Sequence, residues 1–320
     1  MWKNTFILCM LSVGVMVCMG LKPIEKVPLT KKDYTDTYLI VTDQSQQRIA
    51  CIDLKTRTVI WEWKAAIGVP AIHQKWFSNI SEGKLVYNGK YLLITASGGG
   101  VALVRISDKT TVFYTYVGGN THSAEILPDG NIVAASSTGG VLTLIHVDLN
   151  NFPDHLYKKT LAMADAHNVV WDRRRQILWS ASVGKLVGYT YNFNCKAPDL
   201  IVKEAIDLPA TGCHDLFPVY GKDELWLSTS TKVWTISLKS KTIKEIANLP
   251  RIKSIDSGPK GYPVIVLQGI DTQKQWYNDK ILDLTDKEIF RTGGLKMYKA
   301  RWELPNEFSY QANNEFKTCN

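Results

Sequence analysis

The sequence predicts an all-β protein, a six-bladed β-propeller with four-stranded antiparallel blades that is closed by its C-terminal strand. Three observations predict it: a motif that recurs along the chain, reverse-turn residues inside each copy, and a C-terminal segment that resembles the opening strand of the motif. Propellers repeat a unit of four short strands with this kind of period. No helical period competes with the repeat.

The repeat is clearest in the middle of the chain. Residues 122–136 align without a gap on residues 167–181, and residues 214–228 follow the same scheme with one extra residue in the turn. Related segments begin at Ser81 and Lys253. The starting positions 81, 122, 167, 214 and 253 are 41, 45, 47 and 39 residues apart, which is the spacing of propeller blades.

Each copy contains a strand, a turn and a second strand. Residues 128–131 carry the Pro, Asp, Gly and Asn that favour a reverse turn, and the β-branched residues that follow favour a strand. Third strands are predicted at residues 141–148, 185–191, 232–238 and 280–284.

The two ends of the chain complete the first blade. Strand-like runs occur at residues 38–42, 48–54 and 59–63, but an opening strand is missing there. Residues 299–305 match residues 122–128 in register, so we expect the C-terminal strand to supply it. Such closure leaves no open sheet edge, and we expect a monomer.

The N-terminal end predicts export. Lys3 precedes an apolar run over residues 6–17, which is too short to cross a bilayer that needs about 20 residues. We therefore expect no transmembrane span after signal removal. The expected division is a signal peptide at 1–20, an N-terminal linker at 21–35, the β-propeller at 36–310 and a C-terminal tail at 311–320.

Two processing routes remain open, because Cys18 could be lipidated or Leu21 could follow ordinary cleavage. The protein is then a surface lipoprotein in the first case and periplasmic in the second. Export places four cysteines in an oxidising compartment, where they could pair or remain isolated thiols. They are Cys51, Cys195, Cys213 and Cys319.

The net charge of +8 is moderate, and the basic residues are spread along the chain rather than clustered. This distribution argues against a nucleic-acid partner. It remains compatible with attraction to an acidic glycan or to an anionic surface.

The repeat also predicts a polar ring. Opening strands line the axis of a propeller, so equivalent positions at their starts surround one mouth. Three of the six histidines in the chain occupy adjacent blades of this ring. The ring residues are Ser81, His122, His167, His214, Lys253 and Lys299.

Three interpretations of the ring remain open. In the first, His122, His167 and His214 bind a divalent metal and form a catalytic centre. In the second, no metal binds and one histidine is a general base. In the third, the ring only lines a wet channel.

The metal-free interpretation needs cations for an acidic substrate. Lys253, Lys299 and Arg301 are the candidates, because they could hold a carboxylate or sulfate. Near the same mouth, Lys75 and Trp76 suit a sugar ring, whose apolar face stacks on an aromatic side chain. In the metal interpretation, three nearby carboxylates are expected to orient the histidine rings: Glu125, Asp165 and Asp215.

Four segments, residues 96–103, 118–125, 165–172 and 214–219, resemble a family of exported bacterial six-bladed β-propellers of unassigned function. The likeness covers nearly all of the mature chain and implies fold and export rather than an activity. More loosely, a histidine cluster at a propeller axis is similar to that of oligogalacturonate lyases. Blade number and motifs differ from those enzymes, so no residue role is carried over.

These observations together predict an exported protein that binds a glycan or another small polar or acidic ligand at a histidine-lined axial site. As an enzyme, it would be a metal-dependent lyase or hydrolase. The alternative is a non-catalytic scaffold that holds a protein partner.

Overall fold

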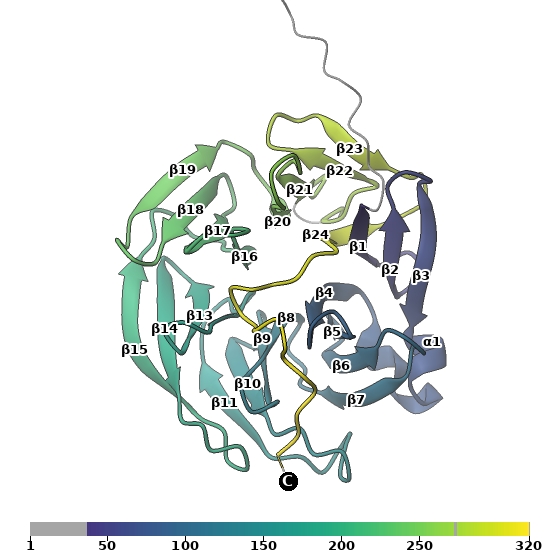
Figure 1. The fold of residues 1–320 in the computed structure, drawn as a ribbon, viewed down its shortest axis with the longest axis vertical. Helices are drawn as coiled ribbons and strands as arrows, with labels where there is room; N and C mark the ends of the chain where they lie inside the picture. Colours follow the sequence, from purple (N-terminus) through teal and green to yellow (C-terminus); the bar gives the residue numbers. More distant parts are fainter. Residues whose placement is uncertain (1–36, 272–273, 320) are drawn as a thin grey trace, which may run out of the picture. The chain divides into compact units, whose positions relative to one another are not determined.

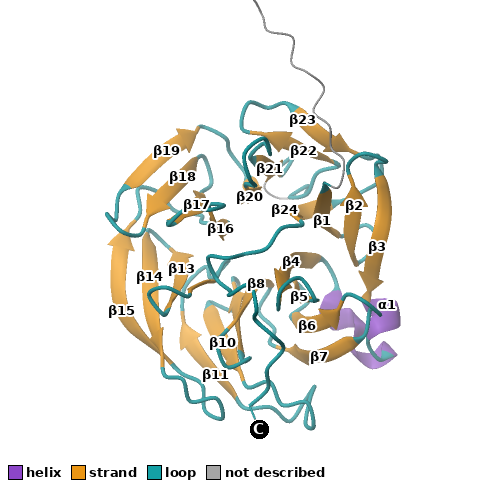
Figure 2. Ribbon diagram, in the orientation of Figure 1, coloured by secondary structure: helices purple, strands orange, loops and turns teal. Residues whose placement is uncertain are grey.

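The computed structural model describes residues 37–271 and 274–319, so the expected signal peptide and linker lie outside the described residues. The described chain forms six four-stranded antiparallel sheets arranged around a central axis (Figure 1, Figure 2). The predicted six-bladed propeller is therefore confirmed.

The first blade contains both ends of the propeller. Its sheet has the order β24 (Met297–Trp302), β1 (Tyr38–Asp43), β2 (Arg48–Asp53) and β3 (Thr58–Lys64). The innermost strand β24 pairs antiparallel with β1, with Leu39 opposite Trp302. The C-terminal strand thus supplies the missing opening strand, as the register of the repeat predicted.

The other five blades each use four consecutive strands, the first of which is innermost. The second blade has β4 (Ile80–Val86), β5 (Tyr91–Ala96), β6 (Gly100–Arg105) and β7 (Thr111–Tyr116). The third has β8 (Thr121–Ile126), β9 (Ile132–Ser136), β10 (Val141–Ile145) and β11 (Lys158–Ala162). The fourth has β12 (Val170–Asp172), β13 (Ile177–Ser182), β14 (Lys185–Tyr191) and β15 (Leu200–Asp207). The fifth has β16 (Asp215–Pro218), β17 (Glu224–Ser228), β18 (Val233–Ser237) and β19 (Ile243–Ala247). The sixth has β20 (Ile252–Asp256), β21 (Ile265–Gln268), β22 (Lys280–Asp283) and β23 (Glu288–Arg291).

Two short helices connect the first and second blades: α1 (Ala65–Gly68) and the 3-10 helix η1 (Ala71–Phe77). Neither these nor any other helix in the described residues is long and apolar enough to cross a membrane.

The apolar core is divided among the gaps between neighbouring blades. For example, Trp179 of β13 is 1% exposed and packs with Leu216 and Leu225 of the next blade. Six such clusters are buried in the described chain. Each blade therefore buries one face against the blade before it and the other against the blade after it, as expected for a radial repeat.

After β24, residues 303–319 form a strap that crosses the centre of the face shown in Figure 1 and continues over the third blade. A disulfide joins Cys319 to Cys195, which lies 124 residues earlier. Phe316 also stacks on Tyr91. Of the described cysteines, Cys51 and Cys213 are free, the latter buried.

Candidate functional site

The three predicted histidines lie side by side at one end of the axis. The rings of His122 and His167 stack, with 4.7 Å between their centroids and 8° between their planes. The ring of His214 meets that of His167 edge to face at 4.8 Å. His122 and His167 are only 6% and 7% exposed, respectively. Radial closure thus brings together residues that are one blade apart in the sequence.

A repeated β-bulge occurs at three of the six ring positions. The pairing of β8 with β9 shifts register between Thr121 and Ser123, so His122 is left out of the ladder. The pairing of β20 with β21 shifts in the same way around Lys253, and that of β4 with β5 around Ser81. A bulge bends the strand and changes the direction of the extra side chain. At these three positions the repeat therefore sets the direction of the side chain as well as its place along the chain.

Lys253 is the cation of the histidine cluster. Its Nζ lies 3.1 Å from Nε2 of His214. Burial, and then the charges of Lys299 and Arg251, lower the pKa of Lys253 to about 8. At neutral pH the ammonium donates to Nε2, because it has no acceptor of its own. A neutral His214 ring then carries its proton on Nδ1.

Burial keeps the imidazoles of His122 and His214 neutral. Desolvation, and then the charges of His167 and Lys299, hold the pKa of His122 well below its usual value. Desolvation, and then the charge of Lys253, does the same to the pKa of His214. In both rings Nδ1 is buried and has no hydrogen-bond partner among the described residues. Buried polar atoms nearly always have a partner, so a ligand or water is needed to complete this site.

The carboxylates expected to orient the rings divide into two groups. Asp165 does so, because its Oδ1 and its backbone oxygen lie 3.1 Å and 3.0 Å from Nδ1 of His167. The expectation is wrong for Glu125 and Asp215. Glu125 lies 3.3 Å from Nζ of Lys84, and Asp215 accepts hydrogen bonds from the two cations of β24.

Those two cations, Lys299 and Arg301, lie in a buried ion-pair network. Nζ of Lys299 lies 3.2 Å from Glu82 and 3.1 Å from Asp215. Nη2 of Arg301 lies 2.7 Å from each of the same carboxylates. Burial would raise the pKa of Glu82, but Lys299, Lys84 and Arg301 outweigh it and lower that pKa. Within the described chain, Lys253 has no carboxylate at ion-pair distance, whereas Lys299 and Arg301 do.

The channel also contains carboxyl groups that hold protons near neutral pH. Burial raises the pKa of Glu125 to about 7, and it raises the pKa of Asp256 to about 7. Glu82, Lys84 and Asp256 were not among the residues predicted from the sequence. Their positions in the repeat could have indicated them. Glu82 follows the ring residue Ser81 by one place, and Lys84 follows it by three. Asp256 follows the ring residue Lys253 by three places, and positions one and three places along a strand share a face.

Lys75 and Trp76 lie away from this cluster. Both belong to η1, and Lys75 is exposed. Trp76 stacks on His73 at 3.8 Å and contacts Tyr116 of β7, the strand of its sheet farthest from the axis. The structure therefore does not bring these two residues to the histidines.

The described residues contain no group of three or more histidines, cysteines or carboxylates arranged to hold a metal ion. Nε2 of His214 is instead engaged by an ammonium group. A cation beside neutral imidazoles provides hydrogen-bond donors and a positive potential. Chemically, the arrangement suits an anion better than a second cation.

Among solved structures, one similar chain is a protein of unknown function from Bacteroides caccae, with a TM-score of 0.54 and 14% sequence identity. The match covers 83% of this chain and 98% of that one. The dihydro-heme d1 dehydrogenase NirN is also similar at 14% identity and a TM-score of 0.46, over 78% of this chain and 52% of that one. The first of these likenesses concerns the fold alone.

No curated protein matches the sequence. A family model described as a family of unknown function, DUF6528, matches residues 5–320. This agrees with the expected membership in a propeller family of unassigned function. The chain belongs to the DUF6528 family.

Proposed function

We propose that the protein binds a small acidic ligand, such as a uronate sugar, at the histidine end of its axial channel. The observation that carries the proposal is the state of Lys253, a cation that is 6% exposed and lacks a carboxylate partner within the described chain. A buried cation without a carboxylate at ion-pair distance is costly, and a ligand carboxylate would supply one.

The neighbouring imidazoles suit the rest of such a ligand. His214 offers an N–H group next to Lys253, and His122 has an unpartnered ring nitrogen. Neutral imidazole donates and accepts hydrogen bonds, which matches sugar hydroxyl groups. As an exported protein, it would meet acidic glycans in the periplasm or at the cell surface.

The same groups support a lyase reaction on a uronide. A neutral histidine would remove the proton beside the carboxylate, the electron pair would form a C4–C5 double bond, and the C4–O bond would break with its electrons leaving on oxygen. Lys253 would stabilise the negative charge that develops on the carboxylate.

Isothermal calorimetry with galacturonate and glucuronate tests the binding proposal, with galactose as the neutral control. We expect the uronates to bind at least about tenfold more tightly than galactose. Lys253→Met should weaken uronate binding about tenfold or more, whereas Lys260→Met, which removes an exposed lysine charge, should change it less than about twofold.

Three outcomes would contradict the proposal. Equal affinity for galactose would show that the carboxylate of the ligand does not contribute to binding. Unchanged binding in Lys253→Met, or no binding of any sugar, would favour the scaffold alternative. Binding that requires added Zn²⁺ and is lost with a chelator would favour the metal interpretation. Turnover of oligogalacturonate is followed separately, because eliminative cleavage creates an ultraviolet-absorbing double bond.

A further inference from the structure

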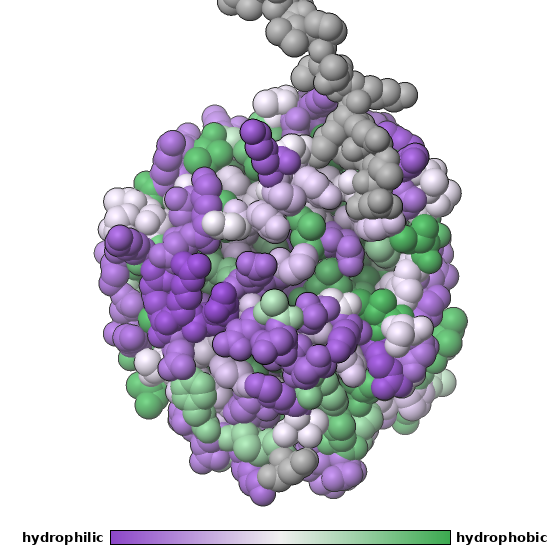
Figure 3. All heavy atoms as spheres, viewed as in Figure 1, coloured by the Kyte–Doolittle hydropathy of each residue, from purple (hydrophilic) through white to green (hydrophobic). Residues whose placement is uncertain are grey.

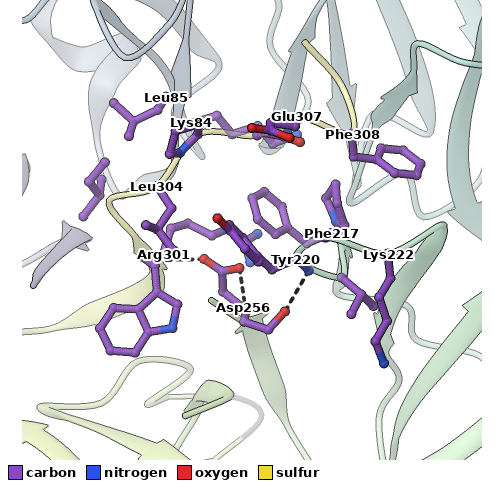
Figure 4. Close-up of a pocket in the computed structure, with 18 of the residues that line it drawn as sticks. Lys84, Leu85, Phe217, Tyr220, Lys222, Asp256, Arg301, Leu304, Glu307 and Phe308 are labelled. Atoms are coloured by element: carbon purple, nitrogen blue, oxygen red, sulfur yellow. Dashed lines mark hydrogen bonds between the residues drawn. The ribbon is translucent and has the colours of Figure 1, made fainter. Parts of the chain in front are cut away.

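The opposite end of the axial channel opens into a pocket beneath the strap. Its volume is about 180 Å³, and its lining includes residues 304–308 of the strap. The lining contains none of the three clustered histidines. In Figure 4, Arg301 and Asp256 approach the pocket from the inner strands, while Phe217 and Tyr220 approach from the fifth blade. This pocket, here called the strap pocket, is separate from the histidine end.

One side of the strap pocket is aromatic and apolar. Phe217 stands under the guanidinium of Arg301, whose carbon lies 3.9 Å from the ring centroid. Tyr220 is 39% exposed, and its backbone N–H donates to the Ser257 hydroxyl at 3.0 Å. Leu304 of the strap adds an aliphatic surface. Together these groups suit the body of a small planar or aliphatic molecule.

The charge of the lining is positive. Five cationic residues line the pocket against two carboxylic residues. Lys84 and Arg301 already pair with buried carboxylates, so the exposed cations of the lining are what favour an anion over a cation. The cations are Lys84, Arg173, Arg174, Lys222 and Arg301. The carboxylic residues are Asp256 and Glu307. On the same face, hydrophilic side chains gather over the fourth and fifth blades beside the centre (Figure 3).

Two of these cations retain binding capacity. The terminal nitrogens of Arg301 bind Asp215, Glu82 and a backbone oxygen, but its buried Nε has no hydrogen-bond partner among the described residues. Arg174 is exposed at the rim, and the neighbouring carboxylates Asp172 and Asp223 form ion pairs with Arg175 instead. An anionic group between them would satisfy both.

We propose that the strap pocket is a second binding site, specific for a small organic carboxylate with an aromatic or aliphatic body. The body lies against Phe217, Tyr220 and Leu304, and the carboxylate faces Arg174 and Arg301. The cavity is smaller than the roughly 300–1,000 Å³ of sites for drug-sized ligands, so the ligand is of the size of an arylacetate.

Calorimetric titration with phenylacetate tests this second site. Phenylacetamide is the neutral isostere, and acetate is the control carboxylate that lacks the aromatic ring. We expect phenylacetate to bind at least about fivefold more tightly than either control. Arg174→Ser and Tyr220→Ala alter exposed side chains and should each weaken phenylacetate binding about fivefold or more. Arg57→Ser removes an exposed arginine outside the lining and should leave the affinity within about twofold.

The two sites are distinguished by testing each variant with the ligand of the other site. Phenylacetate binding should persist in Lys253→Met, and uronate binding should persist in Arg174→Ser. Absence of phenylacetate binding, equal binding of phenylacetamide, or unchanged affinity in both strap-pocket variants would overturn the second site. None of these results depends on whether the histidine end binds a uronate.

Discussion

The charge of Lys253 is held in the folded protein at an energetic cost. Its pKa of about 8 lies below the value of about 10.4 for lysine in an unfolded chain. Between these pH values the unfolded chain binds the extra proton, so this residue makes the protein more stable as pH rises through that window. At neutral pH the full cost is present, about 3 kcal/mol.

We therefore predict that Lys253→Met stabilises the protein at pH 7 while it weakens ligand binding. The free energy of unfolding should rise by up to about 3 kcal/mol, and the gain should fade at pH 10. Urea denaturation at both pH values measures the effect. If the variant were less stable than the parent at pH 7, interactions within the protein would offset the cost of burying the Lys253 ammonium, and the prediction would be wrong.

Glu125 should affect stability in the opposite pH direction. Its folded pKa of about 7 lies above the unfolded value, so the folded protein keeps a proton that the unfolded chain has lost. Its contribution to stability is complete at low pH and is lost as pH rises to about 7.

In Glu125→Gln we expect this dependence to disappear. The loss of unfolding free energy between about pH 4.5 and pH 7 should shrink by about 3 kcal/mol relative to the parent. Denaturation with urea across this range provides the measurement. A curve that stays parallel to that of the parent protein would assign the proton to another group, such as Asp256.

At the scale of single elements, strand positions followed from the sequence more closely than strand ends did. The third strand predicted at residues 185–191 is β14 (Lys185–Tyr191), because β15 pairs along its whole length and β13 pairs with all but its last residue. The strand predicted at residues 141–148 ends at Ile145 instead, where its pairing with β11 ends. Strand ends depend on partners that propensity does not reveal.

Gly188 of β14 gives a test of packing between elements. A Cβ at this position would lie 2.7 Å from Cζ3 of Trp179 on the neighbouring strand, which is closer than atoms can pack. We predict that Gly188→Ala lowers the free energy of unfolding by about 1–3 kcal/mol. The matched change Gly293→Ala, where a Cβ meets no atom within 4 Å, should be within about 0.5 kcal/mol of neutral. Thermal unfolding compares the two, and equal melting temperatures would contradict the packing argument.

At the scale of the whole molecule, closure depends on charges as well as on strand pairing. Arg301 of β24 binds Asp215 of the fifth blade and Glu82 of the second, so one side chain connects three blades across the axis. Removal of one partner from a buried ion pair leaves an uncompensated charge.

Arg301→Met should therefore lower the free energy of unfolding by about 3–5 kcal/mol. Arg105→Met breaks an exposed pair with Asp108 and should leave the free energy of unfolding almost unchanged, because solvent screens that pair. Urea denaturation with a fluorescence readout checks both variants. If the two losses were equal, the buried network would not contribute to closure.

The sequence by itself determined the number of blades, the closure by the C-terminal strand and the convergence of His122, His167 and His214. Each of these follows from a period along the chain, because radial repetition converts equal spacing into proximity. Only the tertiary structure decided the partners in the channel and the disulfide. Arg301 and Glu82 are 219 residues apart, and Cys195 and Cys319 are 124 apart. No local pattern selects such partners, because they meet through packing across the axis or over the face of the fold rather than through their positions in one repeat.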